Sequence, residues 1–99
     1  KKKMKPIKKK KLSKIRLELD KLDNSLIKVI KKRAILVKKV LVLKENRNQI
    51  VDHKRINIIL KNIRKKSLKN NIDPKITNRI WKNMIWSFID YERRNFKKK

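Results

Sequence analysis

The stretch "IKVIKKRAILVKKVLVLK", residues 27–44, carries an apolar stripe with two cations inside it. Apolar residues recur at three- and four-residue steps, at Leu12, Ile15, Leu19, Leu22, Leu26, Ile30, Val37 and Leu41. This spacing predicts one long helix with a single buried face. The same face holds Arg33 and Lys44, where the pattern demands apolar side chains. Because buried unpaired cations are costly, we expect an anion to meet both of them.

The composition favours an all-α fold. The chain has 99 residues, which is near the lower limit for burying a self-sufficient core. It contains no glycine, so hairpin-rich β architectures, which need left-handed turns, are disfavoured. Helices joined by asparagine-containing loops are the natural alternative. Cysteine is absent as well, which excludes disulfides and thiolate chemistry.

The formal net charge of +26 points first to nucleic acid or another anionic surface. Eleven lysines, however, lie in the terminal runs "KKKMKPIKKKK" and "KKK", and an AT-rich genome would place lysine on any solvated face. We therefore do not expect nucleic acid to be the partner, although a basic helical nucleic-acid-binding protein stays an alternative.

Neither a membrane span nor a secretion signal is visible. No apolar run approaches the roughly 20 residues that cross a bilayer. The lysine-rich N-terminus is followed by more lysine and not by the apolar segment of a signal peptide. We expect a cytoplasmic protein without a membrane partner.

We expect a disordered basic arm over residues 1–9, a helical domain over 10–96 and a basic tail over 97–99. Within the domain, the predicted order is a helix over 10–45, a loop over 46–51, a helix from Asp52, a loop over 66–73 and a helix from Asp73 to about Asn95. The first helix would measure roughly 50 Å. So small a chain cannot cover its stripe, and we expect a homodimer in which a second copy supplies the partner helix.

The later helices have apolar stripes of their own. The second helix carries Ile56, Ile59, Leu60 and Ile63, and the third carries Thr77, Trp81, Met84, Ile85 and Phe88. Glu92 falls on the third stripe, between Trp81 and Ile85 in angle. It is the third charged residue predicted to point inward.

Helical spacing limits which anion could meet the cations. Arg33 and Lys44 stand about 16 Å apart along the axis, so side chains reaching about 6 Å inward could clamp a small dianion. Arg16 lies about 25 Å from Arg33 on the same helix, too far to reach that ligand. An antiparallel partner helix could bring Arg16 there. The stripe therefore predicts a small-anion site shared between two chains.

The segments "IRLELDKLDNSLIKVIKKRAILVKKVLVLK", "IVDHKR" and "RIWKNMIWSFIDYE" resemble the all-helical class of chorismate mutases, the type II family. The resemblance covers about residues 12–95. It implies an intertwined homodimer of three-helix chains. It also implies that the protein rearranges chorismate, a dianion, to prephenate on the route to phenylalanine and tyrosine, without a cofactor or metal.

Four catalytic residues follow from the resemblance. Arg16 would come from the neighbouring subunit, and Arg33 would grip a substrate carboxylate. Lys44 would contact the ether oxygen and a carboxylate. Glu92 stands where the family has Gln or Glu, the second group facing the ether oxygen, and a carboxyl group helps a developing oxyanion only while it holds its proton.

Four further residues would bind the substrate. Asp52 and Arg55 would lie near its hydroxyl and carboxylate at the start of the second helix. Two positions depart from the family pattern, because Ile56 replaces the usual Glu and Phe88 replaces a small polar residue. The Ile56 departure keeps open a related lyase activity, elimination of pyruvate from isochorismate on the same fold.

Overall fold

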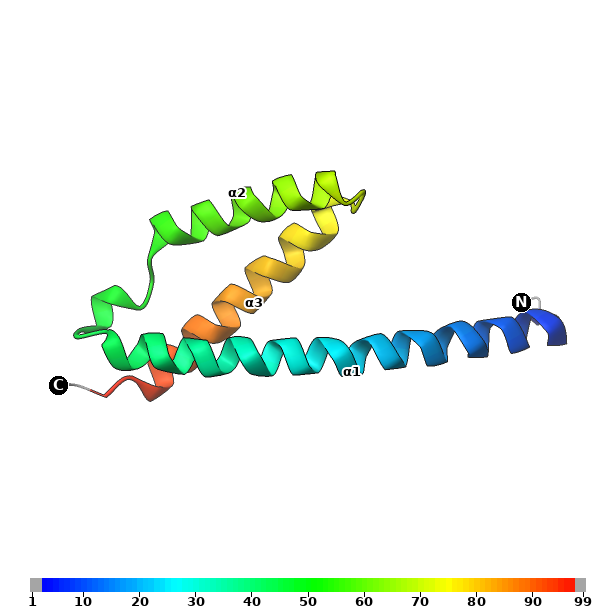
Figure 1. The fold of residues 1–99 in the computed structure, drawn as a ribbon, viewed down its shortest axis with the longest axis horizontal. Helices are drawn as coiled ribbons and strands as arrows, with labels where there is room; N and C mark the ends of the chain where they lie inside the picture. The colour runs from blue at the N-terminus through cyan, green and yellow to red at the C-terminus, as the bar shows by residue number, and fades with distance from the viewer. Residues whose placement is uncertain (1–2, 98–99) are drawn as a thin grey trace. The chain divides into compact units, whose positions relative to one another are not determined.

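The computed structural model describes residues 3–97 and is helical throughout that range apart from short connections (Figure 1). The elements are α1 (Pro6–Leu43), the 3-10 helix η1 (Arg47–Gln49), α2 (His53–Lys69) and α3 (Pro74–Asn95). No strand occurs within residues 3–97, so the predicted all-α class and the three helices are confirmed. Residues 1–2 of the expected arm and 98–99 of the expected tail lie outside the described residues.

Two helix boundaries lie four residues from those predicted. α1 begins at Pro6 and not near residue 10, so residues 6–9 are helical and not part of a disordered arm. Proline suits a first helical position, because the N–H it lacks would have no partner there. α2 continues to Lys69, so the second connection is shorter than the loop predicted over 66–73.

The chain forms two units, Lys1–Ile35 and Leu36–Lys99. The first unit contains most of α1, and no residue of α1 is buried. Ile15, Leu19, Leu22 and Leu26 on the predicted stripe expose 53%, 53%, 65% and 56% of their surface. The pattern that predicted a buried face thus forms a helix, but these four side chains are exposed.

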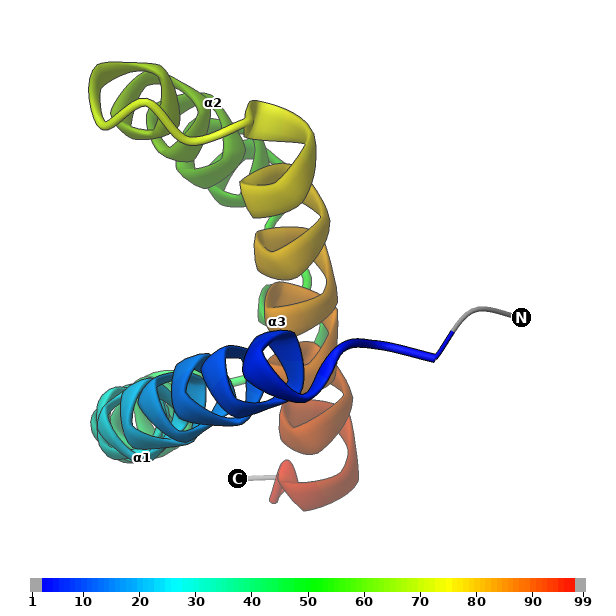
Figure 2. The same cartoon turned by 90° about the vertical axis from the view of Figure 1, so that its right-hand side faces the viewer.

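In the second unit α2 packs against α3, and the two helices meet at the turn that joins them (Figures 1 and 2). The buried core consists of Ile50, Ile56, Ile85 and Ile89, with Val51, Ile59, Leu60, Trp81 and Phe96 packed against it. All residues predicted to face inward on α2 and α3 are buried or half-buried. Both stripes are therefore confirmed.

The α2–α3 turn shows how a chain without glycine ends a helix. Asn71 adopts a left-handed conformation with φ 57°. This lets the Ile72 N–H donate to the Ser67 carbonyl at 2.9 Å and the Asn71 N–H donate to the Leu68 carbonyl at 3.3 Å. Asparagine tolerates this conformation better than most residues. Two carbonyls at the end of α2 thus gain partners.

The start of α3 follows the predicted signal. The Asp73 side chain accepts a hydrogen bond from the Lys75 N–H at 2.9 Å, and Pro74 occupies the first turn. One turn later, Thr77 Oγ1 lies 2.6 Å from Ser67 Oγ of α2, and both residues are buried. Ser67 Oγ also donates to the Ile63 carbonyl at 2.6 Å. This hydroxyl pair joins α2 to α3 inside an otherwise apolar contact.

Candidate active site

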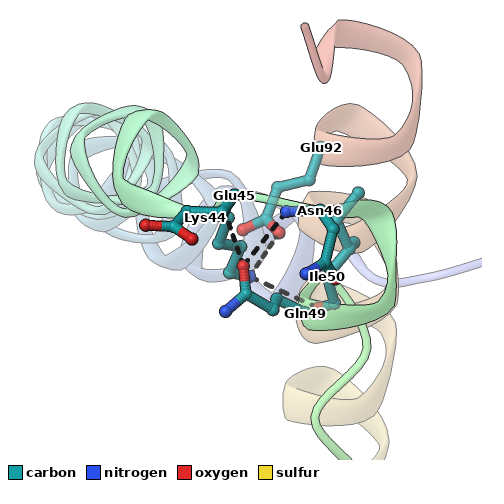
Figure 3. A network of polar contacts seen from close by, with 6 residues as sticks. All are labelled: Lys44, Glu45, Asn46, Gln49, Ile50 and Glu92. Carbon is teal, nitrogen blue, oxygen red and sulfur yellow. Dashed lines mark hydrogen bonds and ion pairs between the residues drawn. The ribbon is translucent and has the colours of Figure 1, made fainter. Parts of the chain in front are cut away.

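The centre of the candidate site is an ion pair between Lys44 and Glu92 (Figure 3). Lys44 directly follows α1, and its backbone N–H still bonds to the Leu41 carbonyl at 3.2 Å. Its Nζ lies 2.7 Å from Glu92 Oε2 on α3, with side-chain exposures of 18% and 8%. Removing one partner of such a shielded pair is costly, because it leaves an uncompensated charge.

Lys44 has a second acceptor nearby. Its Nζ donates to the Ile50 carbonyl at 3.4 Å, and Ile50 is only 3% exposed. An ammonium carries three donors. Two of them point at Glu92 and Ile50, which leaves one N–H for a bound molecule.

Gln49 closes the segment between Lys44 and Ile50 through hydrogen bonds to the backbone. Gln49 Oε1 accepts from the backbone N–H of Glu45 at 2.6 Å and of Asn46 at 3.2 Å (Figure 3). The short helix η1 adds backbone bonds from Gln49 to Asn46 at 3.2 Å and from Ile50 to Arg47 at 3.1 Å. Residues 44–50 therefore form a closed turn that links the end of α1 to the core.

Arg47 of this turn and Lys38 of α1 both contact residues near the end of α3. Arg47 Nη2 donates to the Arg93 carbonyl at 3.3 Å, and its guanidinium lies 5.9 Å from the Phe96 ring centre. Lys38 Nζ lies 6.0 Å from the ring centre of Tyr91. Because Tyr91 and Arg93 flank Glu92 in the sequence, these contacts lie on both sides of the residue that carries the carboxylate.

The four predicted substrate-binding residues divide into two pairs. Asp52 caps α2 by accepting from the Arg55 N–H at 3.0 Å, and both residues are exposed. Ile56 is 9% exposed and belongs to the core, whereas Phe88 is half-buried. Within residues 3–97, no side-chain hydrogen bond or ion pair joins any of the four to Lys44 or Glu92.

The two remaining predicted residues lie in the first unit. Arg16 is exposed on α1. Arg33 is half-buried, and its Nε is shielded from solvent without a hydrogen-bond partner among residues 3–97. A shielded guanidinium N–H without an acceptor is unfavourable, because it has lost its water and gained nothing in return.

A family model described as chorismate mutase type II matches residues 15–93. The chain belongs to this family. No curated protein and no solved structure matches it significantly. Membership of the chorismate mutase type II family implies an isomerase-type enzyme. The match includes Arg16, Arg33, Lys44 and Glu92, and it confirms the resemblance identified in the sequence.

None of the helices formed by residues 3–97 combines the length and the hydropathy that a membrane span requires. Over the same residues, no group of three or more His, Cys, Asp or Glu side chains could hold a metal ion.

Sequence reasoning missed two residues that shape the site, Arg47 and Gln49. Both lie in the connection predicted as a loop over 46–51. Neither lies on an apolar stripe, and polar residues are ordinary in loops, so periodicity gave no signal for them. Only the folded turn shows what they contact.

Proposed function

We propose that the protein is a chorismate mutase that converts chorismate to prephenate without a cofactor. The proposal rests on its membership of the type II family together with one contact, the shielded pair of Lys44 and Glu92. These residues are 48 positions apart in the chain, yet their side chains meet at 2.7 Å. They are the two groups expected to face the ether oxygen of the substrate.

The reaction suits a site built from donors alone. During the rearrangement one C–O bond breaks and one C–C bond forms within a single molecule, so no proton or electron has to leave it. Negative charge grows on the ether oxygen as the C–O bond breaks. The free N–H of Lys44 would meet this charge, and one such preoriented donor typically contributes ~3 kcal/mol to transition-state stabilisation.

Arginine is the residue best matched to the substrate's two carboxylates, because its planar guanidinium binds both oxygens of one carboxylate. Arg33 supports this assignment, since its Nε is shielded and lacks an acceptor within residues 3–97. A substrate carboxylate would supply that acceptor. Asp52 and Arg55 would contact the hydroxyl and the second carboxylate, with Ile56 and Phe88 against the ring.

We propose that the working form is a homodimer with two shared sites. The support is the exposed stripe on α1, where Leu22 and Leu26 leave more than half of their surface uncovered. A second copy would bury this stripe, as large exposed apolar patches commonly indicate an interface. In that arrangement Arg16 of each chain would complete the site of the other chain.

Glu92 would have two tasks. It accepts from Lys44 in the empty site and thereby orients the ammonium. During catalysis it would donate to the ether oxygen, which requires that the carboxyl group take up a proton from solvent when the dianionic substrate binds beside it. An ionised carboxylate without that proton would repel the developing charge.

The direct test is to incubate the purified protein with chorismate and to follow its loss and the appearance of prephenate. We expect saturable conversion at a rate well above the uncatalysed reaction. A parallel incubation with isochorismate separates the related lyase activity, which would release pyruvate. Pyruvate release without prephenate formation would contradict the proposal, and so would an inert folded protein.

A further inference from the structure

We propose that Gln49 is a positioning residue for Lys44. Its side-chain oxygen ties the turn that carries both Lys44 and the carbonyl that receives its ammonium. The role in turnover rests on the proposed function, whereas the effect on the ammonium itself does not.

The hydrogen bonds identify the acting atom of Gln49. Both of its partners are backbone N–H groups, those of Glu45 and Asn46, so the atom facing them is the acceptor oxygen Oε1. The two N–H groups directly follow Lys44, where the chain has left α1 and the helix no longer supplies partners. Gln49 therefore supplies the hydrogen-bond acceptor for the backbone next to Lys44, the residue whose side chain has to be oriented.

The same turn sets the position of the ammonium. Ile50 follows Gln49 directly and is anchored in the core at 3% exposure, and its carbonyl accepts from Lys44 Nζ. With Glu92 Oε2 as the other acceptor, Nζ is held between two fixed oxygens. A lysine side chain has many rotamers. Closing the turn over 44–50 restricts them to those that reach both oxygens.

The role is separable from stability. Gln49 and its two hydrogen bonds are exposed, so water can replace the lost acceptor when the side chain is shortened. The side chain is also not part of the core, which consists of Ile50, Ile56, Ile85 and Ile89 with the apolar residues packed against them. We therefore expect Gln49→Ala to fold normally, with a Lys44 side chain whose ammonium is less restricted to its two acceptors.

The first test measures how readily the Lys44 amine is acetylated in the absence of substrate. Acetic anhydride in limiting amount labels accessible lysines of the intact protein, and peptide mass spectrometry gives the extent at each residue. We expect Lys44 labelling to rise several-fold in Gln49→Ala relative to Lys61 of α2. Gln49→Glu keeps an oxygen acceptor and should restore the wild-type level. Asn48→Ala, a change in the same turn, is the matched control and should leave labelling unchanged.

The second test measures turnover of chorismate by the same proteins. We expect kcat to fall about ten-fold in Gln49→Ala with a smaller change in KM, because a misplaced donor is felt most in the transition state. Gln49→Glu should recover most of kcat, and Asn48→Ala should match the wild type.

The outcomes separate the two proposals. An active wild type with unchanged labelling and kcat in Gln49→Ala would overturn the positioning role and leave the proposed function intact. An inactive wild type would overturn the proposed function, while the labelling experiment would still decide the effect on Lys44. Unfolding of Gln49→Ala by circular dichroism would also overturn positioning, because Gln49 would then be structural. Failure of Gln49→Glu to restore labelling would do the same.

Discussion

The two units of the chain use the same apolar spacing and differ in what covers it. In the second unit α2 and α3 lie against each other, and their stripes form a core around Ile56 and Ile85. In the first unit the stripe on α1 is as regular, yet Leu19 and Leu22 are exposed. Periodicity thus predicts a helix in both units. Burial depends on a second surface, which the chain supplies to one unit and not to the other.

The largest effect is expected from a charge placed on the exposed stripe of α1. If a second copy covers it, Leu22→Glu should prevent dimer formation and abolish activity, because an unpaired carboxylate would be buried at the interface. For comparison, truncating a buried leucine costs about 2–5 kcal/mol. Sedimentation velocity and turnover of chorismate measure the two effects.

Asn24→Glu is the matched control, because it makes the same change of charge on another face of α1. We expect this variant to remain dimeric and active. A Leu22→Glu protein that sediments and turns over like the wild type would show that the stripe needs no partner.

The next largest effect is expected at the two arginines of the first unit. Arg16→Ala and Arg33→Ala should each lower kcat about 10²–10³-fold, as expected when a charged donor is removed from a site. If sites are shared, an equal mixture of the two refolded variants should regain about a quarter of wild-type activity, because half of the dimers are mixed and each carries one intact site.

The mixing experiment needs proof that mixed dimers form. Two affinity tags, one on each variant, allow their isolation before the assay. Isolated mixed dimers without activity would contradict a site shared between chains and would place both arginines in the same subunit's site.

A smaller effect is expected at Glu92. A glutamine can accept from Lys44 through its oxygen and donate through its nitrogen at every pH. Glu92→Gln should therefore keep activity within about ten-fold of the wild type in an assay of chorismate turnover. Glu92→Leu, which leaves Lys44 without its partner, should be nearly inactive. Loss of all activity in Glu92→Gln would exclude the donor role.

The smallest effect concerns the hydroxyl pair inside the covered unit. Ser67→Ala should lower the free energy of unfolding by about 1 kcal/mol, because Thr77 loses a buried partner. Ser67→Ala with Thr77→Val should cost less than the sum of the single changes. Urea unfolding at one fixed protein concentration measures this, and turnover should not change.

Ser87→Ala serves as the control for this pair. Ser87 Oγ makes the same kind of bond, to the Asn83 carbonyl at 2.7 Å, but it is exposed. We expect no measurable loss of stability there. Equal losses at Ser67 and Ser87 would show that the buried pair adds nothing of its own.

Local signals made much of the fold predictable. Asp52 and Asp73 cap helices through contacts within three residues, so the sequence alone is enough to place them. The end of α2 was misplaced because serine and asparagine are common in turns. Ser67 in fact continues the α2 stripe one step beyond Ile63, and its hydroxyl finds partners inside the core. That spacing was the signal available for extending the helix.

Contacts distant in sequence were harder to predict. The stripes marked Lys44 and Glu92 as inward-facing, but periodicity holds no information on which residues of two helices meet. Their pairing across 48 positions appears only when the 44–50 turn is folded. Ile56 shows the same limit, since its stripe marked it as inward-facing without indicating that Ile50, Ile85 and Ile89 would share its core.

The left-handed Asn71 at the end of α2 bears on how such a sequence can change over generations. Glycine codons begin with two guanines, whereas asparagine codons begin with two adenines. A gene drifting toward A and T therefore loses glycine codons, and positions that need a positive φ must then be filled by another residue. Asparagine is the replacement that such drift supplies and that the geometry accepts. A fold whose turns accept asparagine therefore stays open to a gene whose base composition disfavours glycine.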